Sequence, residues 1–176
     1  TKTQGLIKNR EMAAHVKEKG LADYVTQVDI AVQNFLKKEL FALAPDIQFL
    51  GEETGLQEIK ADSFWILDPV DGTTNLMHDY QHSVVSLALC CQGDIIMGII
   101  YDPFRDEVFS AIKGKGSFLN GQPIHVSNAE KLSDTMIGLG TAKREVADEN
   151  FARFRRVFGQ CQDVRRIGSA ALELAY

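Results

Sequence analysis

The stretch 64–75 constrains the fold of this chain more than any other, because four apolar residues lead there directly into two carboxylates. It reads F-W-I-L-D-P-V-D-G-T-T-N. A short apolar run of this kind is typical of a buried strand. Pro69 fixes its own backbone and disfavours helix at the residue before it, so we expect the strand to end at Asp68. The sequence therefore predicts a buried strand whose end carries polar side chains.

Two acids that a short turn brings together indicate a metal site. Asp71 follows Asp68 after two residues. Neighbouring carboxylates repel each other unless a cation lies between them, and their hard oxygen ligands suit Mg²⁺ or Mn²⁺. The backbone N–H groups of residues 72–74 would meet a phosphate where a helical turn begins. The alternative is an ordinary Asp-Pro turn that Asn75 closes.

A second Asp-Pro segment shows what the plain turn looks like. Asp102 also follows an apolar strand, and Pro103 and a second acid, Asp106, follow it. No Gly-Thr-Thr comes after this segment, and the basic Arg105 lies inside it. We therefore expect an ordinary hairpin turn there, with no functional role.

Composition favours a packed globular protein. Of the 176 residues, 45% are hydrophobic, with 14 Gly and 4 Pro, which argues against disorder. The net charge of −5 argues against a nucleic-acid surface. The three cysteines form no Cys-x-x-Cys pair, so we expect a reducing cytoplasm rather than a disulfide framework or a zinc ribbon. The longest apolar run, 84–91, is too short to cross a membrane.

Periodicity predicts helices first and then a run of strands. Residues 1–22 are compatible with helix. Thr26 and Asp29 have the spacing of a capping box, and apolar residues continue at helical spacing to Ala44. Strands are expected at 47–50, 64–67, 83–91, 95–101 and 108–111, and Asn120-Gly121 is a hairpin signal. Residues 83–127 should therefore form an antiparallel meander.

The last part of the chain predicts a change of architecture. A strand is expected at 136–139, a helix at 149–158 and a strand at 164–167. Ser169 then caps a new helix of good helix formers, so we expect the natural sequence to continue beyond it. The chain divides into an N-terminal α+β part, residues 1–133, and the start of a C-terminal α/β part, residues 134–176.

Two further acids have both a plain and a functional interpretation. Glu52 and its neighbour Glu53 follow Gly51 at the end of the strand at 47–50, where a solvated acidic loop is the simpler interpretation. Asp29 is explained equally well as a helix cap. The functional interpretation requires Glu52 to reach the same cation as Asp68.

Three segments in this order resemble the inositol monophosphatase family of metal-dependent phosphatases. They read G-E-E at 51–53, W-I-L-D-P-V-D-G-T-T-N at 65–75 and R-I-G-S-A-A at 166–171, and the stretch 101–121 is similar too. The resemblance covers about residues 23–176. It implies an α/β fold, a layered sandwich with a mostly antiparallel first sheet and the start of a second α/β layer.

The resemblance also implies roles for individual residues. Glu52, Asp68, Asp71 and the backbone carbonyl of Val70 would bind two or three Mg²⁺ ions, or Mn²⁺. A second pair, Asp29 and Thr73, would orient the attacking water. The residues that contact the substrate would be Asp71, Gly72, Thr73, Gly168, Ser169 and Ala170.

The implied activity is Mg²⁺-dependent hydrolysis of a small phosphomonoester, most of all inositol 1-phosphate, by a cytoplasmic homodimer with no nucleic-acid or membrane partner. Related sugar-bisphosphate, histidinol-phosphate and 3′-phosphonucleotide phosphatases are alternatives, as is a non-catalytic regulatory member of the fold. The family takes a further metal-binding aspartate from a W-D-x-A motif. Trp65 is the only tryptophan of the 176 residues, so that aspartate is not among them.

Overall fold

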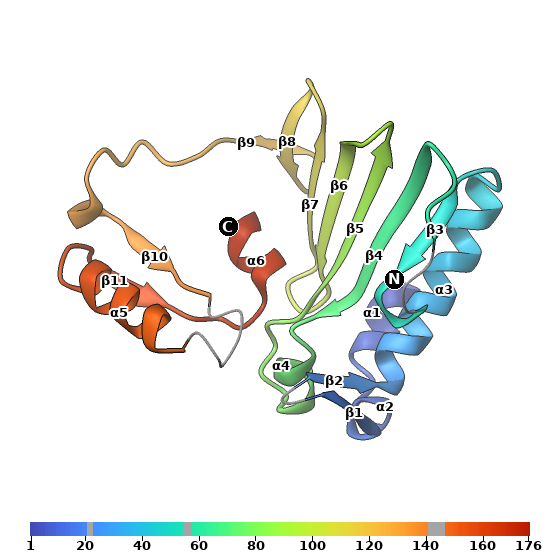
Figure 1. The fold of residues 1–176 in the computed structure, drawn as a ribbon, viewed down its shortest axis with the longest axis horizontal. Helices are drawn as coiled ribbons and strands as arrows, with labels where there is room; N and C mark the ends of the chain where they lie inside the picture. The colour runs from blue at the N-terminus through green and yellow to red at the C-terminus, as the bar shows by residue number, and fades with distance from the viewer. Residues whose placement is uncertain (21–22, 55–57, 141–146) are drawn as a thin grey trace.

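A seven-stranded sheet, with strand order β3-β4-β5-β6-β7-β8-β9, forms the centre of the structure (Figure 1). The computed structural model describes residues 1–20, 23–54, 58–140 and 147–176. The first two strands are parallel, and all later neighbours are antiparallel, as the predicted meander requires. The strands are β3 (Gln48–Gly51), β4 (Ser63–Asp71), β5 (Val84–Cys91), β6 (Asp94–Asp102), β7 (Glu107–Ile112), β8 (Gly116–Leu119) and β9 (Gln122–Ile124).

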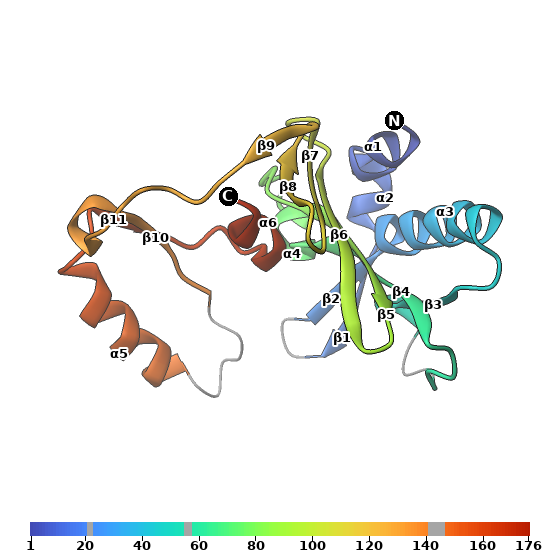
Figure 2. The same cartoon turned by 90° about the horizontal axis from the view of Figure 1, so that it is seen from above.

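Helices lie on both sides of this sheet (Figures 1 and 2). On one side are α1 (Lys2–Ile7), α2 (Arg10–Ala14) and α3 (Gln27–Leu43), and on the other is α6 (Ala170–Ala175). At one end of the sheet, α4 (Thr73–Met77) lies beside a two-stranded antiparallel sheet of β1 (Val16–Gly20) and β2 (Asp23–Thr26). None of the helices in the described part of the chain has the length and apolar character needed to cross a bilayer.

A smaller group of elements lies away from the central sheet (Figure 1). It contains β10 (Met136–Gly138), α5 (Ala147–Phe158) and β11 (Asp163–Arg165), and its two strands are parallel. The single 3₁₀ turn of Leu132–Asp134 precedes it. This arrangement is compatible with the predicted division at residues 133 and 134, which stays a prediction.

The main helix, α3, begins where its capping box predicts. Thr26 is the N-cap: its Oγ1 accepts a hydrogen bond from the N–H of Val28 (3.1 Å), and the N–H of Thr26 donates to Oδ2 of Asp29 (2.9 Å). The apolar face of α3 then packs on β4. Val28 and Val32 are fully buried there against Leu67 and Val70, and this cluster is the core that holds the helix layer on the sheet.

Strand β4 corrects the prediction that its end lies at Asp68. The strand continues to Asp71, and its pairing with β5 shifts between Asp68 and Asp71. Proline has no N–H to offer to a ladder, so it is tolerated in a strand where the pairing is irregular. Pro69 lies inside this irregularity and is fully buried. The irregularity therefore lets the strand carry both acids to its end.

Most other predicted elements are found within two residues of their predicted bounds. β8 and β9 meet at the predicted hairpin, where Asn120 and Gly121 both have positive φ (48° and 78°). Both strands of the small sheet, β1 and β2, were missed, and residues 16–20, which were compatible with helix, form β1 instead. All five residues of β1, V-K-E-K-G, are exposed, so no apolar alternation marks it as a strand.

Truncation of Leu67 tests which residues form the core. Leu67 is 2% exposed, so Leu67→Ala should lower the free energy of unfolding by about 2–5 kcal/mol, measured by urea denaturation. The matched control is Leu43→Ala at the end of α3, where the side chain is 76% exposed and the change should stay within about 0.5 kcal/mol. Similar losses in both variants would contradict this assignment of the core.

Candidate active site

The parallel pairing of β3 with β4 brings two acids side by side. Gly51 pairs with Leu67 at the end of the β3–β4 ladder, so the next residues of the two chain segments, Glu52 and Asp68, lie side by side. Glu52 begins a short 3₁₀ turn, Glu52–Thr54, and its side chain forms a hydrogen bond with that of Asp68. The Glu52-Glu53 segment, for which a solvated loop was the simpler interpretation, therefore lies next to the Asp-Pro segment.

Asp68 occupies an environment that disfavours its charge. Burial, followed by the negative charges of Glu52 and Asp71 and the hydrogen bond with Glu52, raises the pKa of Asp68 to about 8. A hydrogen bond from the N–H of Val70 to Oδ1 (3.0 Å) acts in the opposite direction but is outweighed. The carboxylates at this end of the sheet therefore carry more negative charge than the groups around Asp68 neutralise.

Lys19 supplies positive charge to the neighbouring turn, and no pattern in the sequence pointed to this role. Its Nζ lies 2.5 Å from Oε1 of Glu53 and 3.4 Å from Oε1 of Glu52. Lys19 lies on β1, the strand that apolar periodicity missed. The backbone N–H of Glu53 donates to Oε1 of Gln33 on α3 (3.0 Å), which fixes the turn from the other side.

Asp29, which is buried, forms a pair with the half-buried Thr73. Oγ1 of Thr73 is 3.1 Å from Oδ1 of Asp29 and 3.0 Å from the backbone oxygen of Val70, so its single proton has two acceptors. Oδ2 of Asp29 accepts from both the N–H and the hydroxyl of Thr26. Asp29 is 2% exposed, and burial raises its pKa against the lowering effect of these hydrogen bonds. The acid is thus a helix cap through one oxygen and a partner of Thr73 through the other.

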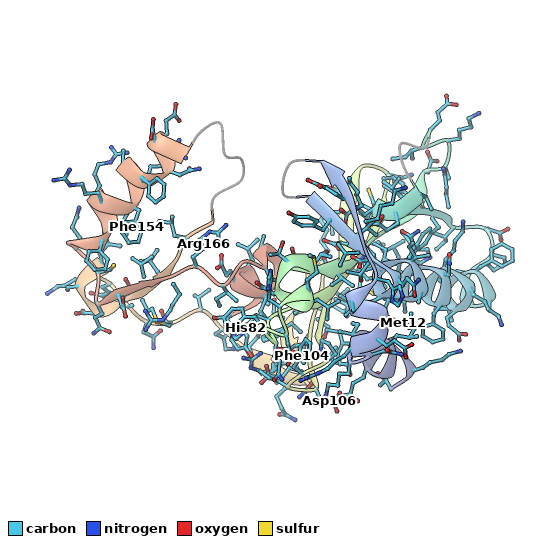
Figure 3. The ribbon with its side chains drawn as sticks, turned by 90° about the horizontal axis from the view of Figure 1, so that it is seen from below. Met12, His82, Phe104, Asp106, Phe154 and Arg166 are labelled. Carbon is cyan, nitrogen blue, oxygen red and sulfur yellow. The ribbon has the colours of Figure 1, made fainter. Side chains whose placement is uncertain are left out.

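Gly72 forms the turn between β4 and α4. Its φ of +93° favours glycine, and a Cβ there would come within 2.9 Å of the backbone oxygen of His82. The hydroxyl of Ser83 donates to the oxygen of Gly72 (2.8 Å). His82 lies beside α4 (Figure 3), where its ring stacks on Tyr80 and its Nε2 is 3.2 Å from the guanidinium of Arg105. The turn is therefore packed from several sides.

Asp71 contacts the segment that was predicted to hold the substrate. Its Oδ2 accepts from the hydroxyl of Ser169 (2.7 Å) and from the N–H of Ala171 (2.6 Å). Nδ2 of Asn75 donates to the backbone oxygen of Ile167 (2.9 Å). Residues from two distant parts of the sequence thus meet at one end of the sheet.

The predicted site residues lie in four neighbouring segments, with different partners. The segments are the start of α3, the turn after β3, the end of β4 with α4, and the start of α6. Within the described ranges, no three His, Cys, Asp or Glu side chains are grouped as a metal centre. The sequence pointed to neither Lys19, nor the supporting role of Ser83, nor the contact of Asn75 with residue 167.

The hairpin at Asp102 is a plain turn, as expected. Asp102 is fully buried; its Oδ1 accepts from the N–H groups of Phe104 (2.8 Å) and Arg105 (3.2 Å). Its Oδ2 pairs with the guanidinium of Arg105 at 2.7 Å. Both oxygens are therefore engaged by the turn itself.

The fold and these contacts define a layered α/β protein with an acidic site at the end of its central strands. The chain belongs to the inositol monophosphatase family, whose model matches residues 3–176.

Curated relatives carry two kinds of name. An inositol-1-monophosphatase of Rhizobium meliloti (strain 1021) is 40% identical over 166 residues, which are 92% of this chain and 62% of that protein. A Nus factor SuhB of Xylella fastidiosa (strain Temecula1) is 39% identical over 170 residues, which are 96% of this chain and 62% of that protein. The chain thus spans 62% of the length of each of these relatives.

Solved structures confirm the α/β fold. The extragenic suppressor protein suhB from Bartonella henselae matches with a TM-score of 0.92 and 36% identity, covering 99% of this chain and 69% of that one. An IMPase/NADP phosphatase complexed with Mg²⁺ and phosphate matches with a TM-score of 0.82 and 26% identity, covering 98% and 65%.

The environment of Asp68 predicts a pH-dependent stability. An acid whose pKa is higher in the folded chain (about 8) than in the unfolded chain (about 3.9) binds its proton more tightly when folded. In a buffer with a chelator that removes divalent cations, the free energy of unfolding should therefore fall as the pH rises from about 4 to about 8. Denaturation at several pH values measures this slope.

Two variants assign the slope to this residue. Asp68→Asn should remove most of it, because the side chain no longer ionises. Asp94→Asn, which changes an exposed carboxylate paired with Lys113, should keep it. An unchanged slope in Asp68→Asn would refute the link between Asp68 and stability.

Proposed function

We propose that this chain forms the metal- and phosphate-binding part of a Mg²⁺-dependent phosphatase that hydrolyses a small phosphomonoester, with inositol 1-phosphate as the first substrate to test. The observation that carries the proposal is the hydrogen bond of Thr73 with the buried Asp29 (3.1 Å) at the same end of the sheet as the Glu52–Asp68 pair. Family membership and the name of the Rhizobium relative support it. The activity of a whole protein is part of the proposal, because the chain spans 62% of that relative.

The donor set suits a hard divalent cation. Glu52, Asp68, Asp71 and the carbonyl of Val70 would hold Mg²⁺, and the family resemblance gives two or three ions, with Mn²⁺ as a substitute. The raised pKa of Asp68 supports this, because a cation would relieve the repulsion that raises it. Bound Mg²⁺ would neutralise phosphate charge and lower the pKa of water. The related phosphatase solved with Mg²⁺ and phosphate is consistent with this choice of ion.

Thr73 and Asp29 would prepare the water for attack. Because Thr73 donates its proton to Asp29 or to the oxygen of Val70, a lone pair of Oγ1 is left to accept from a water. The water's proton would pass through the hydroxyl to Asp29, whose pKa burial raises toward that of a better base. The backbone of Gly72 and Thr73 would bind the phosphate, and residues 168–170 the alcohol portion.

A regulatory role without turnover is the second candidate. The names of the Xylella and Bartonella relatives, a Nus factor SuhB and an extragenic suppressor protein, favour it. Against it stands the local chemistry, since a protein that only binds a partner has no chemical need for a hydrogen-bonded Thr–Asp pair beside paired carboxylates. Sugar-bisphosphate, histidinol-phosphate and 3′-phosphonucleotide phosphatases remain alternatives within the enzyme class.

Assembly and location complete the proposal. We place the protein in the cytoplasm as a homodimer, following the family resemblance and the three cysteines, all free in the structure. The division into residues 1–133 and 134–176 belongs to the proposal as well.

Phosphate release tests the function directly. The protein should release phosphate from inositol 1-phosphate in Mg²⁺. Asp68→Asn should lower the rate of release at least about 100-fold, because even the loss of a group that only supports a metal ligand can cost that much. Asp94→Asn should leave the rate unchanged. Failure to hydrolyse any of a panel of inositol, sugar and nucleotide phosphates would overturn the proposal. Survival of both Mg²⁺ affinity and the cellular effect in Asp68→Asn would favour the regulatory candidate.

Replacement of Thr73 tests the water-orienting pair. Thr73→Val keeps the shape and loses the hydroxyl, so kcat should fall about 10²–10³-fold while Mg²⁺ affinity stays within about twofold. Thr73→Ser keeps the hydroxyl and should retain kcat within about tenfold. Steady-state kinetics and titration calorimetry measure the two quantities. Equal losses of kcat in both variants would show that the hydroxyl is not what matters.

A further inference from the structure

Ser169 is fully buried, although the family resemblance places it among the residues that contact the substrate. Its hydroxyl has one proton, which it donates to Oδ2 of Asp71 (2.7 Å). Its oxygen accepts from the N–H of Leu172 (3.3 Å) as the N-cap of α6. The single proton of the hydroxyl is thus committed to Asp71, and donation of a hydrogen bond to a substrate would require that bond to break.

The carboxylate of Asp71 is oriented by α6. The N–H of Ala171 (2.6 Å) and the hydroxyl of Ser169 both donate to Oδ2, which fixes the plane of the carboxylate. A carboxylate has a second oxygen, so Asp71 can ligate a cation through Oδ1 while Oδ2 stays on α6. Side chains that orient metal ligands in this way tune metal affinity.

The segments around Asn75 and around Gly168 also make close contacts that involve no charged group. Nδ2 of Asn75 donates to the oxygen of Ile167 (2.9 Å), and a Cβ on Gly168 would come within 3.2 Å of Asn75 Oδ1. A Cβ on Gly72 would come within 3.3 Å of Ser169. Figure 1 shows that the chain leaves the central sheet after β9 and returns to it at α6. The contacts of Asp71 and Asn75 therefore fix the place where it returns.

We propose that Ser169 is a positioning residue for Asp71, and that through this hydrogen bond the docking of α6 and the binding of a divalent cation at Asp71 stabilise each other. The proposal rests on the metal role proposed for Asp71. Coupling between two equilibria is reciprocal, so α6 docking raises cation affinity by the same factor by which the cation stabilises docking. This role differs from contact with the substrate and from helix capping alone.

Two substitutions separate positioning from capping. Ser169→Gly removes the hydroxyl but keeps a residue that N-caps helices almost as well as serine. Ser169→Ala removes both the hydroxyl and the cap, so its helix should be less stable. The matched control is Ser83→Ala, which removes another fully buried hydroxyl, bonded to the oxygen of Gly72 rather than to Asp71.

Two measurements test the proposal. The first is calorimetric titration of the full chain with Mg²⁺, and the second is hydrogen exchange of the Ala171 and Leu172 amides with and without Mg²⁺. Both Ser169 variants should bind Mg²⁺ about tenfold more weakly, and Ser83→Ala should stay within about twofold. Mg²⁺ should slow exchange of the two amides in the unmodified chain and in Ser83→Ala, and much less in Ser169→Gly.

Three results would overturn the proposal in distinguishable ways. Affinity lost in Ser169→Ala but kept in Ser169→Gly would assign the effect to capping. Mg²⁺ binding that Asp68→Asn removes but both Ser169 variants keep would overturn the positioning role and leave the proposed function standing. No Mg²⁺ binding by the unmodified chain would overturn both.

Discussion

The parallel pairing of β3 with β4 is the constraint on which the rest of this site depends. It is the one parallel pair among the described strands of the central sheet, and its register ends with Gly51 opposite Leu67. Glu52 and Asp68 therefore lie side by side just past the last paired residues, and burial, followed by the charges of Glu52 and Asp71, raises the pKa of Asp68 to about 8. Like charges held this close by a sheet cannot separate without loss of strand pairing. The surrounding chain has to accommodate the charge, and it does so with contacts that also hold the periphery of the fold.

The acids around Asp68 have partners from different parts of the sequence. Lys19 of β1 pairs with Glu53 and Glu52, the start of α6 donates to Asp71, and Thr73 donates toward Asp29 at the start of α3. These contacts connect β1, α6 and α3 to one end of the sheet. Charge that would destabilise an isolated strand end therefore also helps to fix the positions of these three elements. A cation at this end would act on the same contacts.

The sequence predicted those features whose cause is local. The capping box at Thr26 is complete within four residues, and the strand at 64–67 is marked by its own apolar run, so both were found. The expectation that Glu52 lies close to Asp68 came from the family resemblance, because a parallel register between two short strands leaves no local pattern in the sequence. Lys19 and β1 were missed because an exposed strand has no apolar periodicity. The extension of β4 past Pro69 depends on irregular pairing with β5, which a single strand's sequence does not encode.

The sequence left open whether an Asp-Pro segment is an ordinary turn or a functional site. The answer depends on how completely the charge of each carboxylate is neutralised. Asp102 is buried with one oxygen on two backbone N–H groups and the other on a guanidinium, so its turn satisfies the charge by itself. Asp68 has one backbone donor and two acidic neighbours, so its charge is not satisfied within the described chain. Asp29 lies between these cases, since Thr26 engages one oxygen and Thr73 the other. One acid can therefore have both a structural and a chemical role, because a carboxylate has two oxygens. One oxygen can be held by the fold, and the other, which contacts a hydroxyl or a cation, is available for chemistry.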